Sequence, residues 1–379
     1  MAKHEVFKKI RNGPTIFIIG LFLFSCSQEA TKYDELSTID GYQNAIIMIG
    51  DGMGYNHIQV TKSYNESASL YLEEEALISG WVKTKSANSL ITDSAAAATA
   101  MSSGQKTNNG MIAYRNNRSL TTMAQFAKAY GKGVGIIATE TLTGATPAAF
   151  SAHNISRGNT DQIAAEQISN NIDVYLGAGK AYYDGKKPAM SENNLSYYTD
   201  FAALHDDVNL TINDEQLLFT RFLGSFDTIS TIEPSTPSAP TLKDMSLQAL
   251  NYLSFKFQEQ GFFLMIEGSH IDKRAHDKDL VGMINQLNGF NEAVSGVVEW
   301  AKQKGETFVM VTADHETGGL QYEDESKSEL SDAMFTRSGH SGIDVPFYIY
   351  NSLNLSFIEP GETIDNTDIA KIYRAILRN

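Results

Sequence analysis

The alternation of short apolar runs with longer amphipathic stretches constrains the fold of this chain most strongly. The apolar runs are Ala45–Ile49, Val134–Ala138, Val174–Leu176, Phe262–Ile266, Phe308–Thr312 and Val345–Tyr350. Their near-continuous hydrophobicity is typical of strands buried on both faces of a parallel sheet. The expected helices are Ser94–Ser103, Leu120–Ala129, Asp161–Asn170, Leu242–Gln258, Leu280–Lys304 and Thr367–Leu377. This alternation predicts an α/β fold, a three-layer sandwich with helices on both faces of a largely parallel central sheet.

Two segments favour loops over regular structure. Gly224–Thr241 carries three prolines among serines and threonines, and Gln321–Arg337 is polar, which predicts a surface insertion. No convincing domain boundary appears after residue 40. We therefore expect residues 41–379 to form one catalytic domain, although the chain is long for a single domain.

The N-terminus predicts an export signal over residues 1–25. A basic start is followed by the apolar run Thr15–Phe24, which is too short to span a bilayer. Leu23–Cys26 then resembles a bacterial lipobox, in which the cysteine is acylated and becomes the mature N-terminus. We expect a lipoprotein held to a membrane through Cys26, facing the periplasm or the cell surface, with residues 26–40 as a polar tether. The alternative is a plain cleaved signal in which Cys26 is incidental.

The charge balance limits the choice of partner. The net charge is -15, and no basic stretch lies outside the N-terminal segment, so we expect no nucleic acid as a specific partner. A phosphate ester would need local positive charge from metal ions or arginine.

Metal-ligand residue types gather after several of the expected strands, where open α/β sheets bind their ligands. The residues are Asp51, Thr146, Glu267, Asp272, His276, Asp314 and His315, and the loop that carries Thr146 also carries Arg157. Carboxylates mixed with imidazoles suit zinc, and oxygen ligands alone suit magnesium. Each residue has an ordinary alternative, such as a tight turn at Asp51 or a solvated helix face for Asp272 and His276. Their joint placement indicates a metal centre.

Ser94 is the candidate nucleophile. It precedes an alanine run and would lie at the start of a helix, whose free N–H groups and dipole attract anions. The alternative is an ordinary N-cap serine. No Gly-x-Ser-x-Gly nucleophile elbow competes with it.

Six segments in order resemble the motif set of alkaline phosphatases, and the resemblance covers the chain from about residue 42 onward. The segments are IGDGMG (Ile49–Gly54), TDSAAAATA (Thr92–Ala100), ATPAAFSAHNISR (Ala145–Arg157), EGSHIDKRAH (Glu267–His276), TADHETGG (Thr312–Gly319) and SGHSG (Ser338–Gly342). The resemblance implies an alkaline phosphatase-like fold, two zinc ions and one magnesium ion.

The resemblance also implies a role for each matching residue. The first zinc would be held by Asp272, His276 and His340, the second by Asp51, Asp314 and His315, and magnesium by Asp51, Thr146 and Glu267. Ser94 would be the nucleophile, Arg157 would bind the phosphate, Asp93 would orient Arg157, and Lys273 would lie near the substrate. His4, His57, His153, His205 and His270 match no ligand position, so we expect them to be structural or solvated.

The implied reaction is hydrolysis of phosphate monoesters through a phosphoserine on Ser94. Alternatives are a phosphodiesterase of the same superfamily and a surface lipoprotein that binds phosphate without turnover. A sulfatase is disfavoured, because Ser94 lacks the Cys/Ser-x-Pro-x-Arg context. Many relatives are dimers, so a homodimer is compatible with the resemblance.

One position departs from the family pattern. Gly144 stands where relatives have aspartate or histidine. Without a carboxylate there, we expect a weak magnesium site and a Lys273 that has lost its usual partner and could approach the phosphate. The alternative, left open by the sequence, is that another loop carboxylate replaces the missing one.

Overall fold

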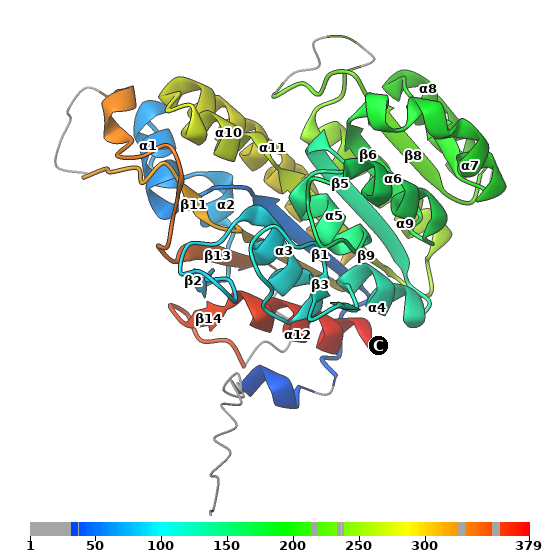
Figure 1. Ribbon diagram of the computed structural model, residues 1–379, viewed down its shortest axis with the longest axis horizontal. Coiled ribbons are helices and arrows are strands. Elements are labelled where there is room, and N and C mark those ends of the chain that lie inside the picture. The colour runs from blue at the N-terminus through cyan, green and yellow to red at the C-terminus, as the bar shows by residue number, and fades with distance from the viewer. Residues whose placement is uncertain are drawn as a thin grey trace, which may run out of the picture.

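The computed structural model describes residues 32–36, 38–213, 219–232, 236, 239–323, 330–350 and 357–379. A ten-stranded sheet forms its centre (Figure 1). From one edge to the other, the strands are β14 (Thr363–Asp365), β2 (Ile78–Lys83), β13 (Val345–Tyr350), β10 (Thr307–Thr312), β1 (Asn44–Gly50), β9 (Phe262–Gly268), β5 (Gly133–Thr141), β6 (Val174–Ala178), β8 (Phe222–Phe226) and β7 (Ser196–Tyr198). All neighbours pair in parallel except β13, which is antiparallel to both β10 and β2.

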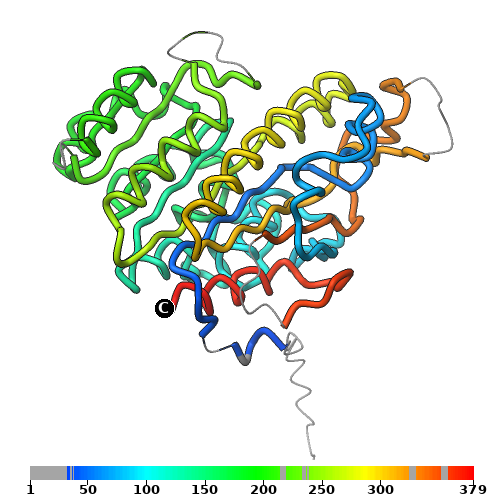
Figure 2. The backbone as a smooth tube through the Cα atoms, turned by 180° about the vertical axis from the view of Figure 1, so that it is seen from behind, coloured from blue at the N-terminus to red at the C-terminus, as the bar shows by residue number. Residues whose placement is uncertain are grey.

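Helices cover both faces of the sheet, which confirms the predicted three-layer α/β architecture. One face carries α3 (Ser94–Ser103), α4 (Met123–Ala129), α5 (Ala145–Ser151) and α12 (Asn366–Leu377). The other carries α1 (Tyr55–Tyr64), α2 (Tyr71–Glu74), α8 (Phe201–Asn213), α9 (Leu242–Lys256), α10 (His270–His276) and α11 (Leu280–Lys304). Figures 1 and 2 show the two layers from opposite sides, with α11 running along the back of the sheet.

The remaining elements are short or lie at the margins. They are the helices α6 (Thr160–Ser169) and α7 (Lys187–Glu192), the 3-10 turns η1 (Lys32–Glu35), η2 (Lys180–Tyr182), η3 (Asp184–Lys186) and η4 (Asp332–Met334), and the strands β3 (Tyr114–Arg115), β4 (Arg118–Ser119), β11 (Glu316–Thr317) and β12 (His340–Ser341). Within the described residues, no helix is both long and apolar enough to cross a membrane.

All six predicted strands and all six predicted helices are present, with ends that move by a few residues. The central strands β1, β9 and β10 are buried along their whole length, as expected for strands covered on both faces. One expectation is wrong: Gly224–Phe226, assigned to a loop, is the second half of the buried strand β8. The expected insertion Gln321–Arg337 contains η4 where it is described, and its residues 324–329 lie outside the described residues.

The export signal and Cys26 lie outside the described residues. The described part of the expected tether packs against the domain. Tyr33 and Ile39 are buried, the Tyr33 hydroxyl lies 3.1 Å from Glu362, and the Ile39 N–H donates to the Ala375 carbonyl at the end of α12. Packed structure therefore begins before residue 41.

Candidate metal centre and active site

The carboxyl ends of four adjacent strands, β10, β1, β9 and β5, meet at one edge of the sheet. Asp51 directly follows β1, Asp314 and His315 closely follow β10, and Glu267 lies at the end of β9 opposite Ile49 of β1. Because parallel strands end on the same side, side chains that are far apart in the sequence come together here. The structure brings the predicted ligands into two clusters and one adjoining group.

The first cluster consists of Asp272, His276 and His340. Asp272 Oδ1 lies 3.3 Å from His276 Nε2 and 3.7 Å from His340 Nε2, and the two Nε2 atoms are 3.1 Å apart. Asp272 and His276 are one turn apart on α10, which places them on the same helix face as predicted.

The second cluster consists of Asp51, Asp314 and His315, all buried. His315 Nε2 lies 3.6 Å from Asp51 Oδ1 and 3.2 Å from Asp314 Oδ2. The rings of His315 and His340 stack with their centroids 3.5 Å apart, so the two clusters adjoin.

Each histidine of the clusters is oriented through its other ring nitrogen. Nδ1 of His340 lies 2.8 Å from the Thr92 carbonyl, Nδ1 of His276 contacts the Ser338 carbonyl, and Nδ1 of His315 lies 3.2 Å from the Thr317 hydroxyl. Partners of this kind fix the tautomer and the ring plane of metal-binding histidines. All three rings thus direct Nε2 toward the clusters.

The third group consists of Asp51, Thr146 and Glu267. Thr146 lies in the first turn of α5, and both Thr146 and Glu267 are almost fully buried. Burial first, and then the charge of Glu140, raises the pKa of Glu267 to about 8. Burial, followed by Asp314, Asp272, Glu267 and Glu140, also raises the pKa of Asp51 well above its usual range.

The donor atoms of this region fit metal cations. Buried oxygens without a hydrogen-bond partner are Asp51 Oδ1, Asp314 Oδ2, Glu267 Oε2 and Thr146 Oγ1. Burying carboxylates side by side is costly unless a cation compensates them. The two clusters mix carboxylate with imidazole, which suits zinc, and the third group offers only oxygens, which suits magnesium.

Gly52 lets the turn after β1 pack closely against α10 and against the segment that follows β10. Gly52 follows Asp51 with φ +73°, and a Cβ built on it would lie 2.8 Å from the Asp272 Cα. Its N–H donates to Asp314 Oδ1 at 3.1 Å and its carbonyl accepts from Thr317 N–H. Only glycine fits a turn that is both left-handed and this crowded.

Ser94 lies beside the second cluster, at the first residue of α3. It is almost fully buried, and its Oγ lies 3.3 Å from His315 Nε2. The helix is capped by Asp93, which accepts from Ala96 N–H at 2.9 Å, so the alternative interpretation of Ser94 as the N-cap is wrong. Asp93 Oδ2 also lies 3.3 Å from Arg157 Nη1, as expected for a residue that orients Arg157, whose side chain is partly exposed.

Lys273 does not lack a partner, contrary to the expectation drawn from Gly144. Its ammonium forms an ion pair with Glu140, which lies near the end of β5. Sequence reasoning missed Glu140, although it follows the same rule as the other site residues, a carboxylate at the carboxyl end of a central strand.

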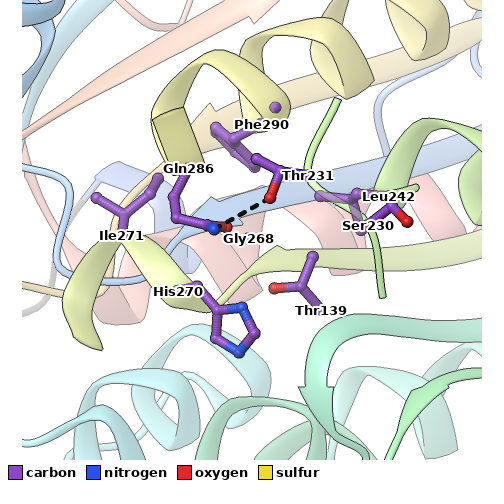
Figure 3. Close-up of a pocket in the computed structure, with 10 residues that line it drawn as sticks. Thr139, Ser230, Thr231, Leu242, Gly268, His270, Ile271, Gln286 and Phe290 are labelled. Atoms are coloured by element: carbon purple, nitrogen blue, oxygen red, sulfur yellow. Dashed lines mark hydrogen bonds between the residues drawn. The ribbon is translucent and has the colours of Figure 1, made fainter. Parts of the chain in front are cut away.

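The other described histidines lie outside the clusters, as predicted. His153 contacts Glu166 at 2.6 Å, His205 contacts Gln248 at 2.7 Å, and His57 is fully buried. His270 lines a small cavity together with Thr139 and Gln286 (Figure 3). His4 lies outside the described residues.

Comparison with known proteins identifies relatives over most of the chain. Residues 42–334 match the family model of alkaline phosphatase. "Alkaline phosphatase 4" of Bacillus subtilis is 37% identical over 296 residues, which cover 73% of this chain but only 62% of that protein. Among solved structures, the alkaline phosphatase of the Antarctic bacterium TAB5 is 28% identical with a TM-score of 0.74, covering 89% of this chain and 99% of that one. A variant of that enzyme with one histidine replaced by aspartate and magnesium in its M3 site gives a TM-score of 0.72 at 27% identity, covering 88% and 98%.

Proposed function

The chain belongs to the alkaline phosphatase family, and we propose that it hydrolyses phosphate monoesters in a metal-dependent reaction through a phosphoserine on Ser94. The observation that carries this proposal is the place of Ser94. Its hydroxyl is buried at the start of α3, next to His315 of the second cluster. The preceding residue, Asp93, contacts Arg157, the proposed phosphate-binding residue.

We assign one zinc ion to the first cluster, a second zinc ion to the second cluster and one magnesium ion to the third group. The mixed donor sets and the unpaired buried oxygens support this assignment, and the TAB5 variant holds magnesium in its own M3 site. When bound, these ions would supply Lewis acidity, which stabilises negative charge on oxygen and lowers the pKa of a bound hydroxyl.

The side chains of the protein would bind and orient the substrate. The Arg157 guanidinium, steadied by Asp93, would hold two phosphate oxygens, and Lys273 lies on α10 near the same site. Ser94 Oγ would attack phosphorus as the alcohol oxygen leaves, and a water would then attack the phosphoserine and release phosphate. The N–H groups at the start of α3 would stabilise charge on the transferred group.

The substrate class is tested by relative rates. We expect the zinc- and magnesium-loaded enzyme to hydrolyse an aryl phosphate monoester far faster than the corresponding diaryl phosphate or aryl sulfate. The reason is that Arg157 and the cations together would stabilise the two negative charges of a phosphate monoester, whereas diesters and sulfate esters carry only one. A faster diester rate would favour the phosphodiesterase alternative, and binding without turnover of any ester would favour a phosphate-binding lipoprotein.

The export, membrane anchoring and oligomeric state of the enzyme are also proposals. We infer that the signal over residues 1–25 exports it and that a lipid on Cys26 holds it to a membrane, on the strength of the lipobox-like Leu23–Cys26. Cell fractionation should place the wild type with membranes and Cys26→Ser in the soluble fraction or in an unprocessed form. A soluble wild type with an unmodified N-terminus would contradict the anchor. Pairing into a homodimer is expected only from the resemblance, and light scattering would decide it.

A further inference from the structure

Glu140 occupies the space that a side chain at position 144 would use. A Cβ built on Gly144 would lie 3.0 Å from Glu140 Oε1 and 3.2 Å from Glu140 Cγ. Gly144 therefore leaves room for a carboxylate that comes from another position of the chain, four residues earlier, on β5.

The carboxylate of Glu140 faces two charged neighbours. On one side it forms the ion pair with Lys273 of α10, and its side chain is only 21% exposed. On the other side lies the third group, because Ala138 of β5 is paired in register with Glu267 of β9 and Glu140 follows it two residues later. The charge of Glu140 accordingly acts on both Glu267 and Asp51. It therefore stands between Lys273 and the proposed magnesium ligands.

We propose that Glu140 is a positioning residue of the third metal group, where its carboxylate holds Lys273 and accepts hydrogen bonds from the hydration water of the cation. The proposal rests on the assignment of a magnesium ion to Asp51, Thr146 and Glu267. Magnesium keeps several of its waters when protein carboxylates bind it, so an outer carboxylate has waters to orient. Relatives with aspartate at the position of Gly144 carry the carboxylate there, whereas in this chain Glu140 would supply it, and Gly144 leaves the space that Glu140 occupies.

The test is a magnesium titration of the zinc-loaded protein by calorimetry, which reads binding without relying on activity. We expect Glu140→Gln to weaken magnesium binding about 10- to 100-fold, as changes in outer-shell partners do, and to leave zinc content unchanged. Lys273→Met should leave magnesium binding equal or tighter, because it removes a positive charge near the cation. If Glu140 only restrained Lys273, Glu140→Gln would have no effect on magnesium binding in the Lys273→Met background, and the proposal would be wrong.

A second set of variants tests whether a carboxylate at position 144 can replace the one at position 140. Gly144→Ala is the control, because any Cβ at position 144 is crowded. In the Glu140→Ala background, Gly144→Asp should bind magnesium more tightly than Gly144→Ala. With Glu140 present, Gly144→Asp should gain nothing over Gly144→Ala, because the space is filled and a second carboxylate would repel the first. Tighter binding by Gly144→Asp with Glu140 present would overturn the proposal.

Two further results separate this proposal from the assignment of the metal. Glu299→Gln removes a carboxylate from an exposed ion pair with Lys302 and should bind magnesium like the wild type. If the wild type binds magnesium and Glu140→Gln binds it equally well, only the role of Glu140 fails. If the wild type binds no magnesium beside zinc, the third metal of the proposed function fails as well.

Discussion

Ser94→Ala is expected to lower the turnover of an aryl phosphate on the order of 10³-fold or more, as the removal of other enzymatic nucleophiles does. The helix should stay intact, because Asp93 and not Ser94 caps α3. Metal content should also stay intact, because the clusters consist of carboxylates and imidazoles. Steady-state kinetics together with elemental analysis of the purified variant would measure both effects.

Ser103→Ala is the matched control for this variant. Ser103 lies on the same helix, and its hydroxyl donates to the Thr99 carbonyl, away from the clusters. We expect its turnover to stay within a few-fold of the wild type, because Ser103 lies at the opposite end of α3 from Ser94 and its hydroxyl bonds to the backbone of Thr99 and Gln105. Full activity of Ser94→Ala with normal metal content would contradict a nucleophilic role for Ser94.

Removal of the metals is expected to destabilise the protein more strongly as the pH rises. Without cations, Asp51, Asp314 and Glu267 share a buried site, and burial raises the pKa of each. An acid whose pKa is raised in the folded state binds more protons folded than unfolded, so stability is lost as the pH rises from its unfolded pKa to its folded pKa. For Glu267 that interval runs from 4.5 to about 8, and the slope is about 1.4 kcal/mol per pH unit for one group.

Urea denaturation of chelated and metal-loaded protein at pH 6.5, 7.25 and 8 would measure this effect. Below that range His315 opposes it, because burial lowers the pKa of His315 and folding then disfavours its protonation. Between pH 6.5 and 8 the stability of the chelated protein should fall relative to that of the loaded protein. If the difference in unfolding free energy between the two forms stays constant across this range, the buried carboxylates do not destabilise the chelated protein.

The sequence predicted the central layer of the fold well, because buried parallel strands have an unambiguous signal. The continuous apolar runs of β1, β9 and β10 reflect burial on both faces. Strand β2, which lies between β14 and β13 near one edge of the sheet, was missed, since it contains Gly80 and is only partly buried. The reversed direction of β13 was not predictable either, because the direction of a strand depends on the path of its connections and not on its hydrophobicity.

The ligand clusters were predictable, and the partner of Lys273 was not. Most of the ligands follow strand ends or share a helix turn, so the topology brings them together, whereas their division into clusters and the place of His340 came from the family resemblance. Glu140 lies near the end of β5, where the pairing with β6 shifts register between Ile137 and Thr141. Such an irregularity changes which face a side chain points to, so alternation along the strand does not say where Glu140 lies. The sequence showed that position 144 is a glycine, but only the structure shows that Glu140 occupies the space beside it.

The central claim, that Ser94 carries the phosphoryl group during turnover, has a direct test. The metal-loaded enzyme is mixed with an aryl phosphate, quenched in acid within the first turnovers, digested and examined by mass spectrometry. We predict a phosphorylated peptide with the phosphate on Ser94, formed in the wild type and missing from Ser94→Ala. Phosphate on a different residue, or an unmodified enzyme at every quench time and pH while substrate is consumed, would contradict the claim.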